Sequence, residues 1–199
     1  MGVPSTELAQ RASRGDEAAL GDLMGRHLSA LRAYVRLRAG HAVRAKESVS
    51  DLVQSACREV LCDLGPDAKL GEAEFRQWLY RAALHKVIDR ARFHKAERRD
   101  VAREVNVDRG SGGDGWAGMY ASVVSPSQAI MSKEEVHRIE ATFDELDEAQ
   151  REVILLARVA KLPHVEIAKT MGRTEQATRS LLSRALARLA GLLDQDPEE

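Results

Sequence analysis

The residues best suited to chemistry in this sequence lie in the segment 163–182, where small, polar and basic side chains follow one another at fixed spacing. Ala168 is small enough for two helices to cross closely, and Gly172, four residues later, can adopt the positive φ that a tight turn between them needs. Thr174 then stands where it can cap a second helix, and Glu175 complements the positive end of that helix's dipole. The spacing predicts a helix-turn-helix.

The second helix of such a motif can enter the major groove of DNA and present its polar side chains to bases and phosphates. Arginine can bind guanine through two hydrogen bonds, whereas serine and glutamine can adapt to several base edges. The chemistry that this segment favours is therefore DNA recognition, and an ordinary helical hairpin without a DNA role is the alternative. The side chains in position to reach DNA are Gln176, Arg179, Ser180, Ser183 and Arg184.

The charge distribution favours two contacts with nucleic acid. Basic residues far outnumber acidic ones in the stretch 76–103 and again in the stretch 158–188. The net charge is nevertheless −1, because acidic residues gather at 134–148 and 194–199. Two basic surfaces on a neutral chain are what two separate phosphate contacts need. For either stretch alone, a solvated helix face without a DNA role is the alternative.

Other kinds of site find no support in the residues. Cys57 and Cys62 are five positions apart in a predicted helix, so their side chains point to different sides and we expect buried, inert thiols. His85 and Asp89 could form half of a metal site, but no further ligands complete it. The sequence has no glycine-rich phosphate loop and no nucleophile beside a base. We therefore expect no cofactor, no metal, no small-molecule substrate and no enzymatic activity.

The elements that must position these residues are helices. Apolar residues recur at steps of three and four through most of the chain, and aromatic residues make up only 4% of it. In the first half we expect two helices that separate at Gly15-Asp16, a polar stretch over residues 40–48, a helix capped by Ser50 and Asp51, and another that starts after Gly71. The predicted fold class is all-α.

A change of composition divides the chain into two parts. Residues from about 104 to 126 contain the glycine-rich run 110–115 and show no apolar periodicity. We therefore predict two small helical domains, 1–103 and 128–194, joined by a flexible linker over residues 104–127. No apolar run approaches the roughly 20 residues that span a bilayer, and the first residues lack a signal-peptide pattern. We expect no membrane insertion and a cytoplasmic protein.

Several of these segments resemble one known family. Residues 146–156, which lead into the predicted helix-turn-helix, resemble the fourth conserved region of sigma-70-family factors, which reads the minus-thirty-five promoter element. Residues 51–54, Asp-Leu-Val-Gln, resemble the motif that docks on the clamp helices of the polymerase largest subunit. Residues 75–81, followed by Asp89-Arg90, resemble the part of the second region that melts and reads the minus-ten element.

The resemblance covers residues 8–99 and 130–192 in the family's order, so the chain is identified as a member of the extracytoplasmic-function (ECF) group of sigma factors. It implies a sigma region 2 bundle in the first domain, a sigma region 4 helix-turn-helix in the second, and a protein that binds core RNA polymerase and directs it to promoter DNA. An anti-sigma factor is a further partner that it allows. The residues that it implicates are Asp51, Leu52, Val53 and Gln54 for core polymerase; Trp78, Tyr80, Arg81, His85, Lys86, Asp89, Arg90 and Arg92 for minus-ten DNA; and Arg173, Thr174, Gln176, Arg179, Ser180, Ser183 and Arg184 for minus-thirty-five DNA.

Some of these positions keep a second interpretation. The spacing of Trp78 favours a core position over base stacking, and Asp51 could cap a helix or face solvent. His85 stands where the family often carries Asn, Thr178 where it usually carries Val or Ile, and Leu181 where relatives are often basic. The base read at minus ten and the strength of the minus-thirty-five contact are therefore open.

The alternative function is a two-domain helix-turn-helix regulator that binds DNA as a dimer without polymerase. A sigma factor differs in how it gains affinity. Two basic patches on a flexible linker bind a promoter weakly until a scaffold fixes their separation, and polymerase would be that scaffold.

Overall fold

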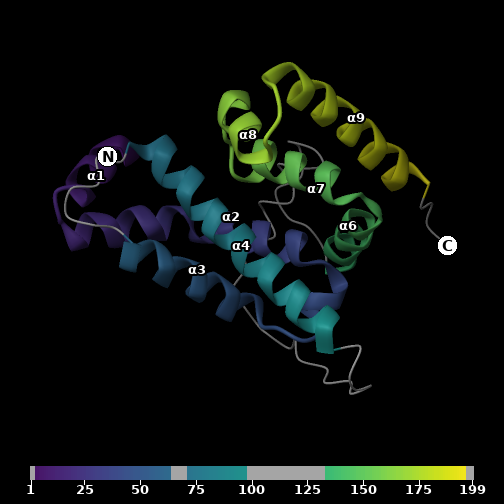
Figure 1. The fold of residues 1–199 in the computed structure, drawn as a ribbon, viewed down its shortest axis with the longest axis horizontal. Coiled ribbons are helices and arrows are strands. Elements are labelled where there is room, and N and C mark those ends of the chain that lie inside the picture. Colours follow the sequence, from purple (N-terminus) through teal and green to yellow (C-terminus); the bar gives the residue numbers. More distant parts are fainter. Residues whose placement is uncertain (1–2, 64–70, 98–132, 196–199) are drawn as a thin grey trace.

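The computed structural model describes residues 3–63, 71–97 and 133–195, and every regular element in these ranges is a helix (Figure 1). The predicted all-α fold class is therefore confirmed. The predicted linker, residues 104–127, lies outside the described residues. None of the described helices combines the length and the apolar composition that crossing a membrane requires.

The first half of the chain is a bundle in which α2 packs against α3 and α4, and α1 packs against α2. The predicted break at Gly15-Asp16 is confirmed, because Gly15 has a φ of 87° and the Asp16 carboxylate accepts a hydrogen bond from the N–H of Ala19 at 2.9 Å. The helices of this half are α1 (Ser5–Ala12), α2 (Glu17–Arg44), α3 (Val49–Asp63) and α4 (Glu72–Glu97).

The expected burial of both cysteines of α3 is wrong, since Cys57 is only partly buried and Cys62 is exposed. Two predicted boundaries in this half are also wrong. The second helix does not give way to a polar stretch at Gly40; it kinks there, with a φ of 67°, and continues to Arg44. The third helix begins at Val49, and its first turn is capped by Ser48, whose Oγ accepts from the N–H of Asp51 at 3.4 Å. Ser48 has the same capping chemistry as Ser50, which is why composition alone placed the start two residues late.

Aromatic side chains fix α4 on α2. The rings of Tyr34 and Tyr80 meet edge to face with their centroids 5.0 Å apart, and both residues are fully buried together with Phe75 and Leu79. Such aromatic pairs add to the free energy gained by burying apolar area. The helix that carries most of the predicted minus-ten residues is therefore held in one orientation by its buried face.

The second half contains the predicted helix-turn-helix. Asp147 and Gln150 form a capping box at the start of α7, Gly172 ends α8 with a φ of 62°, and the Thr174 hydroxyl accepts from the N–H of Ala177 at 3.2 Å at the start of α9. The glycine and the threonine thus have the predicted roles. The elements are α6 (Lys133–Glu145), α7 (Glu148–Ile154), a π-helical turn η1 (Leu155–Val159), α8 (His164–Met171) and α9 (Glu175–Asp194).

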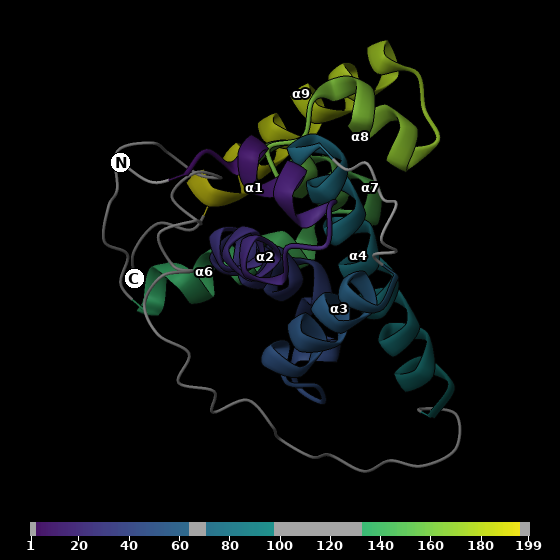
Figure 2. The ribbon, with the colours of Figure 1, turned by 90° about the vertical axis from the view of Figure 1, so that its left-hand side faces the viewer.

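The two halves pack against each other. α2 contacts α6 and η1, and buried apolar residues from both halves belong to one hydrophobic core. Figures 1 and 2 show α6 beside α2. The long helix α2 is therefore central to both halves.

Candidate nucleic-acid and partner interfaces

The outward face of α9 carries the residues predicted to contact DNA at the second site. Those within the helix are spaced by three and four positions, which places them on successive turns of one side of α9, and Arg173 and Thr174 lie just before its first turn. The Arg179 guanidinium forms an ion pair with Glu175, and 64% of its side chain remains exposed. An exposed pair of this kind is weak, so Arg179 can exchange it for a phosphate or a base. The exposed residues are Arg173, Thr174, Gln176, Arg179, Ser180, Ser183 and Arg184.

The opposite face of α9 fixes the helix on its scaffold. Leu181, Ala185 and Leu189 are buried, so Leu181 packs inward. Thr178 is fully buried, and its hydroxyl donates to the Thr174 carbonyl oxygen at 3.0 Å. A buried hydroxyl with a partner carries little penalty, which explains how threonine fits where the resemblance leads one to expect Val or Ile.

The motif at residues 51–54 divides between the surface and the core. Asp51 and Gln54 are exposed one turn apart on α3, whereas Leu52 and Val53 are buried against the bundle. The carboxylate and the amide therefore face outward together, as the spacing predicts. They can bind a basic and polar surface of a partner, and the two apolar residues hold them in position.

The outward face of α4 carries charged residues from the predicted minus-ten set. Lys86 and Arg90 are tied back to neighbouring acids, since Lys86 Nζ lies 2.6 Å from Glu59 and Arg90 Nε lies 3.6 Å from Glu47. The first pair joins α4 to α3, and the second joins α4 to the segment that precedes α3. The predicted contact residues exposed on α4 are Arg81, His85, Asp89, Arg90 and Arg92.

The two aromatic members of that set lie against or within the core. Trp78 is half-buried and packs on the hydrophobic core, as its spacing favours. Tyr80 is 1% exposed, and burial raises the pKa of its phenol, so the group stays neutral. In this structure Tyr80 is a packing residue, and Trp78 presents only part of its ring.

A surface groove of about 370 Å³ joins the 51–54 motif to the basic end of α4. Its lining includes two residues that the sequence reasoning missed, Glu47 and Phe93. Glu47 lies 2.9 Å from His94 Nε2 and also pairs with Arg90, and Phe93 is 51% exposed with the Arg90 guanidinium 6.0 Å from its ring centroid. A lone aromatic residue within a basic run is the signal that could have identified Phe93.

A buried polar cluster between the halves was also missed. The Tyr34 hydroxyl and the Arg38 Nε of α2 each donate to the Glu152 carboxylate of α7 at 2.7 Å. Burial raises the pKa of Glu152, and the nearby Arg38 and Tyr34 oppose that shift. A tyrosine and an arginine four residues apart in a buried helix were the available signal, because buried polar groups need partners.

These features define a class of protein. A helix-turn-helix with an exposed polar second helix, together with a second helix that carries exposed cations, is typical of a DNA-binding protein.

Comparison with known proteins identifies the family. Residues 137–189 match the family described as "Sigma-70, region 4". The RNA polymerase sigma factor CnrH of Cupriavidus metallidurans is 31% identical over 196 residues, which cover 96% of this chain and 95% of CnrH. The RNA polymerase sigma factor NccH of Alcaligenes xylosoxydans xylosoxydans is 32% identical over 190 residues, covering 94% of this chain and 92% of NccH. The chain belongs to the ECF sigma factors of the sigma-70 family.

Solved structures agree with this assignment. The structure of CnrH in complex with the cytosolic domain of CnrY has a TM-score of 0.64 and 26% identity, covering 98% of this chain and 100% of that one. The sigma factor RpoE in complex with the anti-sigma factor NepR from Bartonella quintana shares the fold, with a TM-score of 0.57, 21% identity and coverage of 89% and 98%. The protein is thus an RNA polymerase sigma factor, which favours promoter-specific initiation over the alternative of a regulator that works without polymerase.

Proposed function

We propose that the chain divides promoter selection among three surfaces. Asp51 and Gln54 of α3 bind core polymerase, the outward face of α4 binds the minus-ten element, and the outward face of α9 binds the minus-thirty-five element. We assign the first two to a domain of residues 1–103 and the third to a domain of residues 128–194. The observation that carries this proposal is that the exposed face of α9 and the exposed pair on α3 occur in a chain that matches RNA polymerase sigma factors over nearly its whole length.

At the minus-ten element, the exposed cations of α4 would hold the DNA backbone while a side chain with both donor and acceptor capacity reads a base. Arg81 and Arg92 lie on the outward side and can bind phosphates. His85 is exposed between them, and its imidazole can donate or accept according to its tautomer. Lys86 and Arg90 are held by Glu59 and Glu47, so in the free chain they orient α4.

The proposal extends to partners and location. CnrH is seen in complex with the cytosolic domain of CnrY, and RpoE in complex with the anti-sigma factor NepR. We propose that an anti-sigma factor likewise binds this chain. We also propose that it has no catalytic activity of its own and works in the cytoplasm, where core polymerase transcribes.

The experiment that tests the function is transcription with purified components. Core polymerase with the purified chain is incubated with a library of randomised promoter fragments, and the run-off transcripts are sequenced. We expect transcripts from templates that share two short elements, and none from those templates with core polymerase alone. If the chain fails to direct core polymerase but binds a palindromic DNA site as a dimer, the alternative regulator is the correct interpretation.

A further inference from the structure

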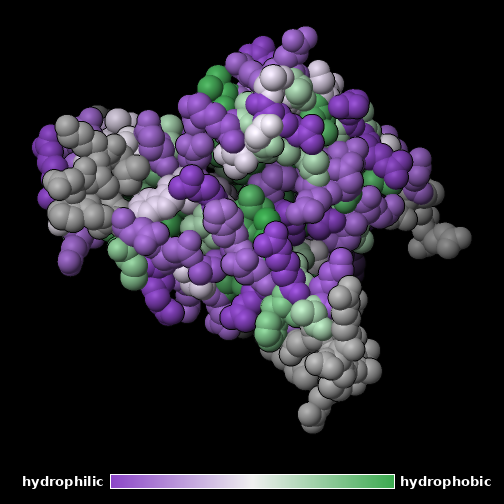
Figure 3. All heavy atoms as spheres, viewed as in Figure 1, coloured by the Kyte–Doolittle hydropathy of each residue, from purple (hydrophilic) through white to green (hydrophobic). Residues whose placement is uncertain are grey.

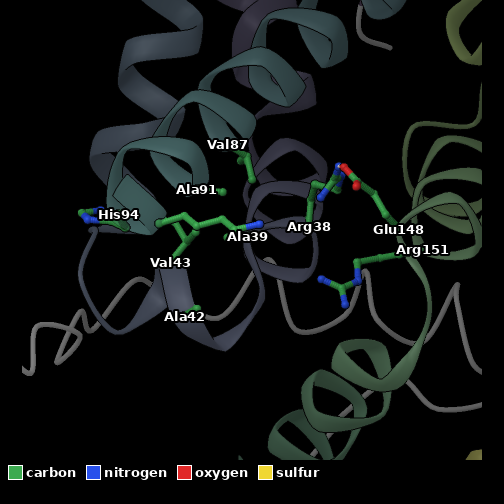
Figure 4. A pocket seen from close by; sticks show the side chains of 10 residues that line it. Arg38, Ala39, Ala42, Val43, Val87, Ala91, His94, Glu148 and Arg151 are labelled. Atoms are coloured by element: carbon green, nitrogen blue, oxygen red, sulfur yellow. The ribbon is translucent and has the colours of Figure 1, made fainter. Parts of the chain in front are cut away.

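A cavity of about 440 Å³ lies between α2, α4 and α7, and none of the residues assigned above to polymerase or to promoter DNA lines it. This volume is typical of sites that hold small organic molecules. Figure 4 shows the cavity from close by, with Arg38 and Val43 on α2, Val87 on α4 and Arg151 on α7. Three helices from distant parts of the sequence therefore build its wall.

One part of this wall is apolar. Val43 of α2 and Val87 of α4 are buried members of the hydrophobic core, and the remaining apolar residues of the lining are alanines. An apolar group bound against this wall leaves water, which favours binding. The alanines are Ala39, Ala42 and Ala91.

Another part of the wall carries an arginine whose charge is incompletely matched. Arg151 Nη2 donates to the carbonyl oxygens of Asp144 and Leu146 at 3.2 and 3.3 Å, and Nη1 lies 3.8 Å from Asp144 Oδ1. The Nε of Arg151 is buried and has no hydrogen-bond partner among the described residues. Burial lowers the pKa of Arg151, although Asp144 opposes the shift, and the charges of Arg38 and Arg44 lower it further. An anion beside this guanidinium would stabilise its charged form.

Lys95 of α4 gives the lining a second cation. Its side chain is exposed, and no acid of the described residues forms an ion pair with it. Arg38 differs, because it already pairs with Glu152 at 2.7 Å and with Glu148 at 2.5 Å. Figure 4 shows Arg38 and Glu148 pointing toward each other. Glu148, the acid of the described lining, is 74% exposed, so its pair with Arg38 can yield to a bound anion.

These two cations favour a phosphate over a carboxylate. A phosphate monoester carries about −1.5 to −2 charges at pH 7 and has three strong acceptor oxygens. It can therefore accept hydrogen bonds from a guanidinium and an ammonium group together, whereas a carboxylate brings a single charge. A ligand of this kind matches both parts of the wall when its phosphate is attached to an apolar body.

We propose that this cavity binds a small phosphate monoester, with its phosphate toward Arg151 and Lys95 and its apolar body against Val43 and Val87. The molecule is bound and not transformed, so it is a ligand of the chain and not a substrate. The site shares no residue with the surfaces proposed for polymerase and promoter DNA. Either assignment can therefore fail without the other.

The test is a titration of the full chain by isothermal titration calorimetry with phenyl phosphate. Inorganic phosphate has the charge without the ring, benzyl alcohol has the ring without the charge, and benzoate has the ring with a single charge. We expect phenyl phosphate to bind with a Kd about tenfold lower than each of the three, because it alone uses both parts of the wall. No measurable binding of phenyl phosphate, or equally tight binding of any of the three, would overturn the proposal.

Two variants test where the molecule binds. Lys95→Ala removes an exposed cation without breaking an ion pair, and Ala91→Phe fills part of the cavity from an exposed position. We expect each to weaken the binding of phenyl phosphate about tenfold. The matched control is Lys169→Ala, which removes an exposed lysine of α8 outside the lining and should leave the Kd unchanged. A wild-type Kd in both cavity variants would place the molecule elsewhere and refute the site.

A measurement on the wild-type chain covers the case in which a variant fails to fold. In nitrogen–proton correlation spectra, phenyl phosphate should shift the backbone amide signals of Ala42 and Ala91, which line the cavity from α2 and α4. The signals of Ser180 and Ser183, on the outward face of α9, should stay in place. Unmoved signals of Ala42 and Ala91 at saturating phenyl phosphate would also refute the site.

Discussion

At the scale of single residues, many buried polar groups of the described chain have a specific partner, and one exception, His27, links protonation to stability. Thr178 donates to Thr174, and Tyr34 donates to Glu152. The Nε2 atom of His27, in contrast, is buried without a hydrogen-bond partner. The His27 ring lies 5.8 Å from that of Phe75, centroid to centroid. Its environment therefore favours the neutral imidazole.

His27 should make the first domain less stable in mild acid. Burial, together with the charge of Arg76, lowers the pKa of His27 in the folded chain, so the unfolded chain takes up the proton first. The stability that it contributes is complete above the unfolded pKa, about 6.5, and is lost as the pH falls from there toward the folded pKa. We expect urea unfolding of His27→Gln to show a smaller decrease in free energy from pH 7 to pH 5 than the wild type. His85→Gln, at an exposed site, is the control, and an unchanged slope in His27→Gln would refute the assignment.

The residues that we propose bind core polymerase give a second prediction at this scale. Asp51 and Gln54 are exposed and Leu52 and Val53 are buried, so Asp51→Ala with Gln54→Ala removes the contact without opening the core. We expect the double variant to lose core polymerase in a pull-down, while its circular dichroism spectrum stays that of the wild type. Arg58→Ala, exposed one turn further along α3, is the control. Normal association of the double variant would show that core polymerase binds elsewhere.

At the scale of elements, the sequence predicted the turns and helix starts that depend only on neighbouring residues. The small residue, glycine and threonine at 168, 172 and 174 determine the turn and the start of α9 within a few residues, and the structure has them as predicted. The kink of α2 at Gly40 could not be predicted in the same way, because its freed N–H is satisfied by Asp144, 103 positions away from the donor His41. Apolar periodicity indicates which face of a helix is buried, but it does not indicate which element packs on that face.

The proposed recognition helix, α9, gives the element-scale prediction. In a helix-turn-helix the N-terminal turns of the second helix reach base edges, so Arg179→Ala with Arg184→Ala should reduce transcription from a minus-thirty-five-dependent promoter. Loss of a bidentate contact costs about 1–3 kcal/mol, or roughly 5- to 150-fold. Arg188→Ala, later on the same helix, should have a smaller effect. Equal activity of the double variant and the wild type would remove α9 from promoter recognition.

At the scale of the whole molecule, the two predicted domains share one hydrophobic core and a set of buried ion pairs. The face seen in Figure 3 is largely hydrophilic, with apolar atoms in small separate groups. The sequence indicated the acidic run at 134–148 and the basic stretches, but it gave no basis for pairing that acidic run with the arginines of α2. The charges in a sequence show which surfaces could attract each other. Which of those surfaces form ion pairs is determined by how the helices pack.

The central claim is the proposal that the outward faces of α4 and α9 bind two promoter elements at a separation that core polymerase sets. The most direct test is the distance between dyes at Ala96→Cys on α4 and Ala187→Cys on α9, in a chain carrying Cys57→Ala and Cys62→Ser, measured by single-molecule energy transfer. We predict a longer distance on core polymerase with promoter DNA than in the free chain. A distance that core polymerase and promoter leave unchanged would contradict the account.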